Sequence, residues 1–299
     1  MRGSAADDVD RRGASRVSVV VTSHDQGELV AEAVASAQRQ TTAPETIIVV
    51  DDGSTDAASL DVVDRLSRTG GVVVHRQANA GVSAARNAGF ALATTPLVAV
   101  LDGDDRFEPT YLERTTAVLD ARPDVLAASS WLRARGVLDA VVRPGGGVAA
   151  DFLHRNACPA EAVVRKDAWE RCGGYDEAMR HGFEDWDFFL GMLGHGGRIE
   201  IVPEPLLLYR TTPVSSNVRS MDRRIELYGR IVDKHRPLFE AHLRETLLAL
   251  ELRSTERQAR WEDAVAADPD APLPDPTFGD GGMASAVRVR SRRSAPPPR

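Results

Sequence analysis

The chain has 299 residues, 42% of them hydrophobic, and a formal net charge of -7 at pH 7. This composition is typical of a globular protein, and the length is enough for one α/β domain of about 250 residues. Because nucleic acids bind basic surfaces, the acidic balance argues against a nucleic-acid partner.

The two ends of the chain differ in composition from its middle. Residues 1–15 are small, polar and charged, without the apolar core of a signal peptide, and residues 266–299 are Pro-rich and then Arg-rich. Such segments bury too little apolar surface to fold, so we expect both to be disordered. No apolar run approaches the roughly 18 residues that cross a bilayer. The two cysteines, Cys158 and Cys172, lack metal-site spacing. We therefore expect a cytoplasmic protein, with any membrane contact peripheral and at the inner face.

Continuous apolar strands alternate with helical patterns over the first third of the chain. Strands are expected at 17–22, 46–50, 72–74 and 96–101, with helices at 28–40, 60–66 and 82–92 between them. This alternation predicts a parallel sheet with helices on both faces. Ligands of such sheets bind beyond the carboxyl ends of the strands.

Polar and acidic side chains follow these strands rather than precede them. The first, second and fourth strands run into residues 23–26, 51–56 and 102–105. The last segment, Asp102-Gly103-Asp104-Asp105, gathers like charges that are costly without a cation. Mg²⁺ and Mn²⁺ prefer carboxylate oxygens and commonly also bind substrate phosphates. Gly103 would let the backbone bend so that Asp102 and Asp104 address one metal site, although Asp-Gly-Asp is also common in surface turns.

The second half of the chain is expected to mix strands and helices before a long helical segment. The expected elements are a strand at 160–165, a helix from 166, a helix beginning at Glu184-Asp185, and strands at 198–202 and 206–210. Residues 221–263 have a helical pattern broken at Pro237. Their role, whether a cover over the catalytic half or a dimer contact, stays open.

Six blocks, in order along the chain, resemble the inverting nucleotide-sugar glycosyltransferases of family 2, which have the GT-A fold. The blocks are 17–25, 48–56, 79–87, 101–105, 173–176 and 183–187. The resemblance implies an α/β, GT-A-like fold with a mostly parallel central sheet, helices on both faces and a C-terminal helical extension.

The same resemblance implies a division of the chain into functional parts. The expected parts are a GT-A domain at 16–215, with a nucleotide-binding half at 16–106 and an acceptor half at 107–215, and a helical extension at 216–265. The implied reaction moves a sugar from a nucleoside-diphosphate sugar, a UDP-sugar first of all, to an acceptor hydroxyl. The acceptor would be a glycan, a lipid-linked molecule or a small molecule, in cell-wall or exopolysaccharide biosynthesis. One alternative is a nucleotide-sugar-binding regulator that has lost catalysis. A nucleotidyltransferase is disfavoured because residues 23–27 are neither Gly-rich nor basic.

Several residues receive donor-binding roles from the resemblance. Asp51 or Asp52 would accept a hydrogen bond from the nucleobase, and Thr22 and His24 would shape the nucleoside pocket. The acidic run after the second strand would also serve as a helix cap, and an isolated histidine is more often structural. Arg86 would pair with the diphosphate or the base, or else form an ordinary ion pair with one of the acids.

The metal and the catalytic base are the remaining implied parts. Asp102 would reach the ribose and Asp104 the metal, Mn²⁺ or Mg²⁺, which neutralises charge on the departing diphosphate. The base would be Asp185, with Glu184 as its orienting neighbour. Acids at a helix start are also stabilised by the helix dipole, which lowers their pKa. Asp185 could serve as base if burial and neighbouring carboxylates push its pKa upward.

Overall fold

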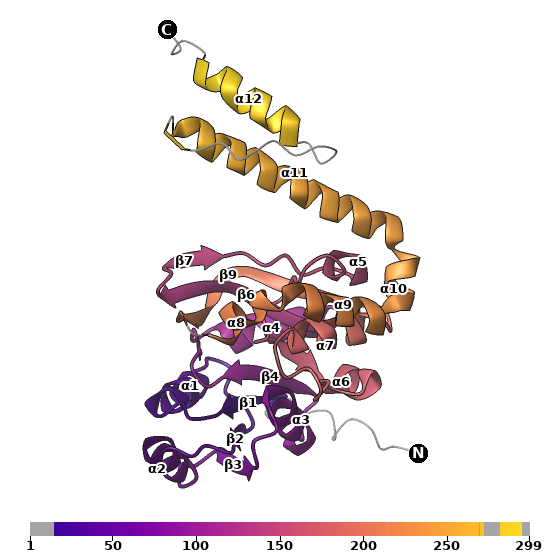
Figure 1. Cartoon of the computed structure of the whole chain (residues 1–299). Coiled ribbons are helices and arrows are strands. Elements are labelled where there is room, and N and C mark those ends of the chain that lie inside the picture. The colour runs from indigo at the N-terminus through magenta and orange to yellow at the C-terminus, as the bar shows by residue number, and fades with distance from the viewer. Residues whose placement is uncertain (1–14, 214, 269, 272–281, 295–299) are drawn as a thin grey trace, which may run out of the picture. The chain divides into compact units, whose positions relative to one another are not determined.

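The structure is a computed structural model that describes residues 15–213, 215–268, 270–271 and 282–294 (Figure 1). Contacts within the chain divide it into two compact units, Met1–Ala241 and His242–Arg299. The first unit contains the whole of the described sheet.

The first half of the sheet is parallel, as the alternating pattern predicted. Its strands, in spatial order, are β3 (Val72–Gln77), β2 (Ile47–Asp52), β1 (Val17–Ser23) and β4 (Leu97–Asp102). Each neighbouring pair in this order runs in the same direction. The connecting helices are α1 (Glu28–Gln38), α2 (Ala57–Leu66) and α3 (Val82–Leu92).

Apolar side chains cover both faces of these strands because successive residues of a strand point to opposite sides. On one face Val20 and Val100 pack in a cluster with Phe90 of α3. On the other face Val19 and Val21 belong to a second cluster, which includes residues of α1. The expectation of helices on both faces is confirmed.

The second half of the sheet is mixed rather than parallel. Its strands are β5 (Arg106–Phe107), β6 (Val125–Gly136), β7 (Ala140–Val142), β8 (Val163–Arg165) and β9 (Arg198–Thr211). Strand β8 is antiparallel to both β4 and β6, and β9 is parallel to β6 but antiparallel to β5. The sheet is therefore parallel in its first half and mixed in its second half, where the long pairing of β6 with β9 is again parallel. The second half lacks the regular alternation of strand and helix that predicts parallel pairing, and there the direction of each strand depends on how the chain returns to the sheet.

The two predicted late strands form the single strand β9. The pairing of β6 with β9 shifts register between Ser130 and Trp131, where Pro203 and Pro205 interrupt the ladder. Proline cannot donate a ladder hydrogen bond, so it is tolerated at such a bulge. The prolines thus shift the register of the strand without ending it.

The remaining helices of the first unit are α4 (Tyr111–Ala121), α5 (Ala149–Phe152), α6 (Lys166–Cys172), α7 (Glu184–Leu193), α8 (Ser216–Asp222), α9 (Arg224–Lys234) and α10 (Arg236–Ala241). Pro237 lies in the first turn of α10, a position where proline costs little. Ile231 and Phe239 are buried in the cluster that covers one face of the sheet. Helices α9 and α10 therefore pack against the core of the first unit.

The second unit consists of α11 (Leu243–Ala267) and α12 (Gly282–Ser294), which lie side by side in Figure 1. Glu262 of α11 forms an ion pair of 2.6 Å with Arg288 of α12. Residues 282–294 are thus helical, although they were expected to be disordered. The arginines of α12 form ion pairs with acids of α11, and composition alone does not reveal these contacts. The expected disorder of residues 1–14, 272–281 and 295–299 lies outside the described residues.

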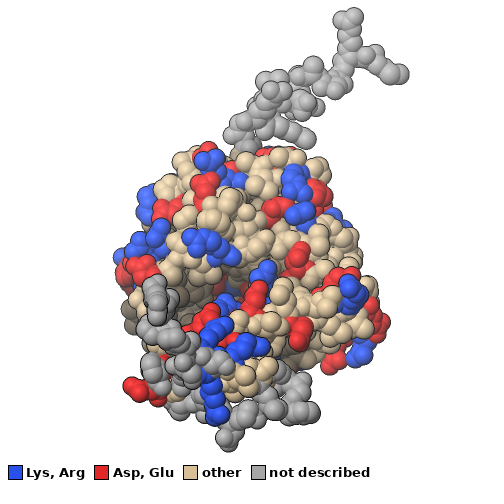
Figure 2. All heavy atoms as spheres, turned by 90° about the horizontal axis from the view of Figure 1, so that it is seen from above, with Lys and Arg blue, Asp and Glu red and all other residues tan. Residues whose placement is uncertain are grey.

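The described helices include none with both the length and the apolar character of a membrane span. On the face drawn in Figure 2, acidic and basic side chains are intermingled, and neither sign forms an extended field there.

Candidate active site

A cavity of about 670 Å³ opens where the carboxyl ends of β1, β2 and β4 meet. The predicted site residues that line it are Thr22, His24, Asp52, Arg86, Asp102, Asp104 and Glu184. Tyr209 and Arg210 of β9 also line it, and the sequence analysis did not single them out. The parallel strands thus bring together acids that are far apart in the sequence, as expected for a sheet of this kind.

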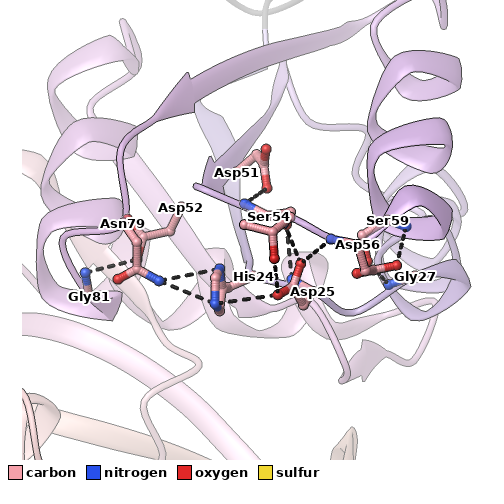
Figure 3. A network of polar contacts seen from close by, with 11 residues as sticks. His24, Asp25, Gly27, Asp51, Asp52, Ser54, Asp56, Ser59, Asn79 and Gly81 are labelled. Atoms are coloured by element: carbon pink, nitrogen blue, oxygen red, sulfur yellow. Dashed lines mark hydrogen bonds and ion pairs between the residues drawn. The ribbon is translucent and has the colours of Figure 1, made fainter.

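Asp25 ties the loop after β1 to the loop after β2 (Figure 3). It has a left-handed backbone, with φ of 51°. Its carboxylate accepts hydrogen bonds from the backbone N–H of Thr55 at 2.7 Å and of Asp56 at 3.1 Å. These backbone hydrogen bonds lower the pKa of Asp25 to about 2. The ionised side chain therefore acts as a fixed clasp between two cavity loops.

His24 is exposed beside this clasp and lines the cavity. Its Nε2 lies 3.7 Å from Asp25 Oδ2 and 3.2 Å from Asn79 Nδ2 (Figure 3). Asn79 precedes α3, so His24 bridges the first strand end and the third connecting loop. This position is compatible with contact to a bound nucleoside.

Asp52, rather than Asp51, faces the cavity. Its carboxylate accepts hydrogen bonds from Ala80 N at 2.9 Å, Gly81 N at 2.8 Å and Gln77 Nε2 at 2.8 Å. Asp52 therefore anchors the loop that leads into α3 (Figure 3). A carboxylate has about four lone-pair sites, which leaves capacity for a ligand donor.

Asp51 is buried and is not among the described residues that line the cavity. It accepts a hydrogen bond from Ser54 N at 3.2 Å, and Arg76 Nε lies 3.9 Å away. The helix-capping role falls to Asp56, whose side chain accepts from Ser59 N at 2.9 Å. Of the two acids named as candidates for the nucleobase, Asp52 lines the cavity and Asp51 does not, because neighbouring strand residues point to opposite sides.

Arg86 is buried, with 1% of its surface exposed, and joins two acids of the cavity. Its Nη2 donates to Asp102 Oδ1 at 2.9 Å and its Nη1 donates to Glu184 Oε1 at 2.9 Å. The guanidinium also lies 5.5 Å from the ring centre of Tyr175. The structure shows Arg86 in ion pairs that join α3 to the end of β4 and to the start of α7, and its role toward a diphosphate or base stays a prediction.

Gly103 allows β4 to pass close to β1. Its N–H donates to Thr22 O at 2.9 Å, and a Cβ at this position would lie 2.7 Å from that oxygen. Thr22 Oγ1 in turn donates to Asp102 Oδ1 at 3.2 Å. Gly103 is not among the glycines with positive φ. Close packing, rather than a special bend, therefore explains why glycine suits this position.

Asp104 carries charge that the protein compensates weakly. Burial and the neighbouring Asp102 raise its pKa, and Gln26 Nε2 donates to it at a long 3.4 Å. The described residues contain no group of three or more His, Cys, Asp or Glu side chains arranged to hold a metal ion. Asp102 and Asp104 nevertheless suit Mg²⁺ or Mn²⁺, since such ions often take one or two carboxylates and complete their shell with water and phosphate.

Behind this pair lies a buried acid that the sequence analysis missed. Glu161 is 1% exposed, and burial raises its pKa to about 7. Burial and Glu161 together raise the pKa of Asp105, whose Oδ1 accepts from Arg210 N at 2.6 Å. The signal in the sequence was a single acid within the apolar run before β8. The sequence alone does not show that Glu161 interacts with Asp105, because only the fold brings the two residues together.

The acidic pair at the start of α7 divides between the cavity and the interior. Glu184 lines the cavity, whereas Asp185 is not among the described lining residues. Asp185 Oδ2 accepts from Asn156 Nδ2 at 2.7 Å and its Oδ1 accepts from Trp186 N at 2.8 Å. Burial and Glu184 raise the pKa of Asp185 to about 7. Burial thus outweighs the effect of the helix dipole, in the direction a general base requires.

The fold and the acidic strand ends define the GT-A class of α/β proteins. A solved structure of Staphylococcus aureus TarS, residues 1–349 in complex with UDP, has a TM-score of 0.58 at 15% identity. The alignment covers 93% of this chain and 89% of that one. The predicted fold class is confirmed at this level.

Sequence comparisons agree with the fold. The family model described as glycosyl transferase family 2 matches residues 18–156. The succinoglycan biosynthesis protein ExoU of Rhizobium meliloti is 28% identical over 209 residues, which are 62% of this chain and 59% of ExoU. An uncharacterized glycosyltransferase of Nostoc sp. is 38% identical over 105 residues, 34% of this chain and 32% of its own. YwdF of Bacillus subtilis, an uncharacterized glycosyltransferase, is 24% identical and covers 74% of this chain and 84% of its own.

The similarity to glycosyl transferase family 2 covers just under half of this chain and agrees with the resemblance that its sequence blocks predicted. The chain spans less than two thirds of the length of the Nostoc protein and of ExoU.

Proposed function

We propose that the protein is a metal-dependent, inverting glycosyltransferase that moves a sugar from a nucleoside-diphosphate sugar to an acceptor hydroxyl. The observation that carries this proposal is the meeting of Asp102, Asp104 and Glu184 in one cavity at the carboxyl ends of the strands. The TarS structure with UDP supports a uridine nucleotide as the donor carrier. ExoU, named for succinoglycan biosynthesis, supports a role in making exopolysaccharide.

The donor nucleoside would lie against the loops after β1 and β2. Asp52 faces the cavity and keeps capacity to accept a hydrogen bond from the N3–H of a uracil. His24 and Thr22 line the same part of the cavity. The Asp25 clasp fixes the two loops before the donor arrives, which reduces the ordering cost of binding.

Asp104 and Asp102 would hold the divalent cation, Mn²⁺ or Mg²⁺. When bound, the cation neutralises the negative charge that develops on the departing nucleoside diphosphate. The raised pKa of Asp104 supports this assignment, because a buried carboxyl next to another acid gains most from a nearby positive charge. Arg86 keeps Asp102 in place from the protein side.

Asp185 would remove the proton from the attacking acceptor hydroxyl. Its pKa of about 7 suits a general base at neutral pH. Glu184 reaches the cavity directly, but its carboxylate is already bound by Arg86 at 2.9 Å. We therefore assign proton transfer to Asp185 and orientation of the pair to Glu184 and Asn156. Because Asp185 lies behind the lining, the acceptor must reach it from the Glu184 side.

The test is a donor panel of uridine, guanosine and thymidine diphosphate sugars, each with and without Mn²⁺, in which nucleoside diphosphate release is measured. Cation-dependent release from at least one donor supports the proposal. Donor binding without any release or transfer would instead support a nucleotide-sugar-binding protein without catalysis. If no nucleoside diphosphate binds, the cavity does not have the proposed role.

A further inference from the structure

A second cavity, of about 290 Å³, adjoins the donor cavity. The two cavities share Val82, Glu184 and Arg219 in their linings. The second cavity therefore lies on the side of the acidic pair, next to the place where the proposed transfer occurs. None of the donor and metal roles proposed above uses the rest of its lining.

One wall of this cavity is the first turn of α3. The first N–H groups of a helix have no partner within the helix and carry partial positive charge. The N-cap residue, Gly81, supplies no capping side chain. Ser83 in the same turn lines the cavity and is 3% exposed, yet its hydroxyl has no hydrogen-bond partner among the described residues. A buried hydroxyl without a partner is costly, and a ligand oxygen at this place would remove the cost.

The opposite part of the lining is rich in cationic side chains. Arg180 and His181 come from the segment before α7, and Arg219 and Arg223 come from α8 and its end. Gly182, with φ of 106°, packs so closely on Ser220 that a Cβ would lie 2.6 Å from the serine Cβ. The segment that carries Arg180 is therefore held against the helix that carries Arg219.

The acids of the lining already have partners. Glu184 pairs with Arg86, and Glu177 accepts a hydrogen bond from Asn87 Nδ2 at 3.1 Å.

Among the cationic side chains, Arg223 forms an ion pair with Glu226, with Nη2 2.6 Å from Oε1. Arg180 is exposed, and it forms no ion pair with the residues that the structure describes. The lining therefore offers a cation, an unsatisfied hydroxyl and a helix N-terminus together. These are the groups that bind a tetrahedral oxyanion.

We propose that this second cavity is an acceptor subsite for a phosphate group, so that the acceptor is a phosphate ester. The inference rests on the proposed transferase function and names the substrate class of its acceptor side. The donor's own diphosphate is assigned to the other cavity, where Asp104 would hold the cation. A phosphate held beside Ser83 and Arg180 would bring the rest of the acceptor past Glu184, toward Asp185.

The test uses the full chain saturated with UDP and Mg²⁺ and titrated with inorganic phosphate in a calorimeter. Phosphate is expected to bind to this complex, and Arg180→Ala and Ser83→Ala are each expected to weaken phosphate binding roughly tenfold while UDP binding is kept. Arg68→Ala is the matched control, because it removes the same charge from an exposed position outside both cavities. Its phosphate affinity should equal that of the parent.

Two further arms identify the source of the phosphate. One titrates glycerol 3-phosphate, and the other adds vesicles of phosphatidic acid in phosphatidylcholine. Binding in either arm supports the proposal provided that Arg180→Ala loses it.

Equal phosphate binding by Arg180→Ala and Arg68→Ala would overturn the proposal. Displacement of phosphate by UDP would also overturn it, because the cavity would then belong to the donor. The UDP titration by itself reports on the proposed function, and phosphate can be titrated without UDP. Failure of one proposal is therefore distinguishable from failure of the other.

Discussion

Asp104 lines the first cavity, and the protein compensates the charge of its carboxylate only weakly. Burial and Asp102 raise its pKa, and its polar contact with Gln26 is long. Asp104→Asn should therefore reduce Mn²⁺-dependent UDP affinity by at least about tenfold while leaving the fold intact. UDP titrations with and without Mn²⁺ measure the effect, with the exposed Asp120→Asn as control. If the variant keeps the parent's metal dependence, Asp104 is not a ligand.

The acidic pair of α7 gives a second prediction at the scale of single residues. Asp185→Asn removes the proton acceptor but can keep the hydrogen bond to Trp186 N, so donor binding should survive while transfer falls by about 10² to 10⁴. Glu184→Gln should cost less, because an amide oxygen can still accept from Arg86. Measured transfer rates with matched UDP titrations decide between them. The reverse ranking would assign the base to Glu184.

Glu161 gives a prediction about stability and pH. Its pKa is raised from 4.5 to about 7, so the folded state holds this proton more tightly than the unfolded state. Stability should therefore fall as pH rises through this window and then level off. Glu161→Gln cannot lose a proton, and it keeps the size and polarity of the side chain.

Relative to the parent, Glu161→Gln should gain on the order of 1–3 kcal/mol between pH 5 and pH 8. Urea unfolding at the two pH values measures this gain. Glu170→Gln, at an exposed position, is the control and should show no such difference. A gain that does not change with pH would mean that Glu161 is ionised in the folded protein.

At the scale of elements, the start of α2 depends on one side chain. Asp56 accepts a hydrogen bond from Ser59 N at 2.9 Å and caps the helix. Asp56→Ala should cost about 1 kcal/mol of unfolding free energy. Urea unfolding measures it against Asp61→Ala, an exposed change in the same helix that should stay within about 0.5 kcal/mol of the parent. If both variants lose the same unfolding free energy, the capping hydrogen bond of Asp56 does not stabilise the protein specifically.

The sequence was most informative where local pattern decides structure. Apolar runs with intervening helices predicted β1 to β4, and the acids after them had to gather at one edge because parallel strands end together. Strand direction in the second half escaped prediction, since β8 lies antiparallel between β4 and β6. Pattern also could not tell Asp51 from Asp52, because one residue of register exchanges the two faces of a strand.

At the scale of the whole molecule, the residues of both cavities lie in the first unit. Their positions run from Thr22 to Arg223, before the division at Ala241. A chain ending at Ala241 should therefore fold and bind UDP with an affinity within about threefold of the full chain. Circular dichroism and UDP titration check these two outcomes. Loss of UDP binding in a folded truncated chain would show that α11 or α12 contributes to the site.

The two ion pairs of Arg86 also bear on which combinations of substitutions this chain can accept. One guanidinium, 1% exposed, satisfies Asp102 on one side and Glu184 on the other. Because the two acids share one buried cation, replacing Arg86 alone leaves both of them without it, which is usually more damaging than replacing the set together. Substitutions at these three positions should therefore be strongly epistatic, and a library that varies them singly would discard combinations that work. Asp104 lies outside these ion pairs, so a substitution there should leave them intact.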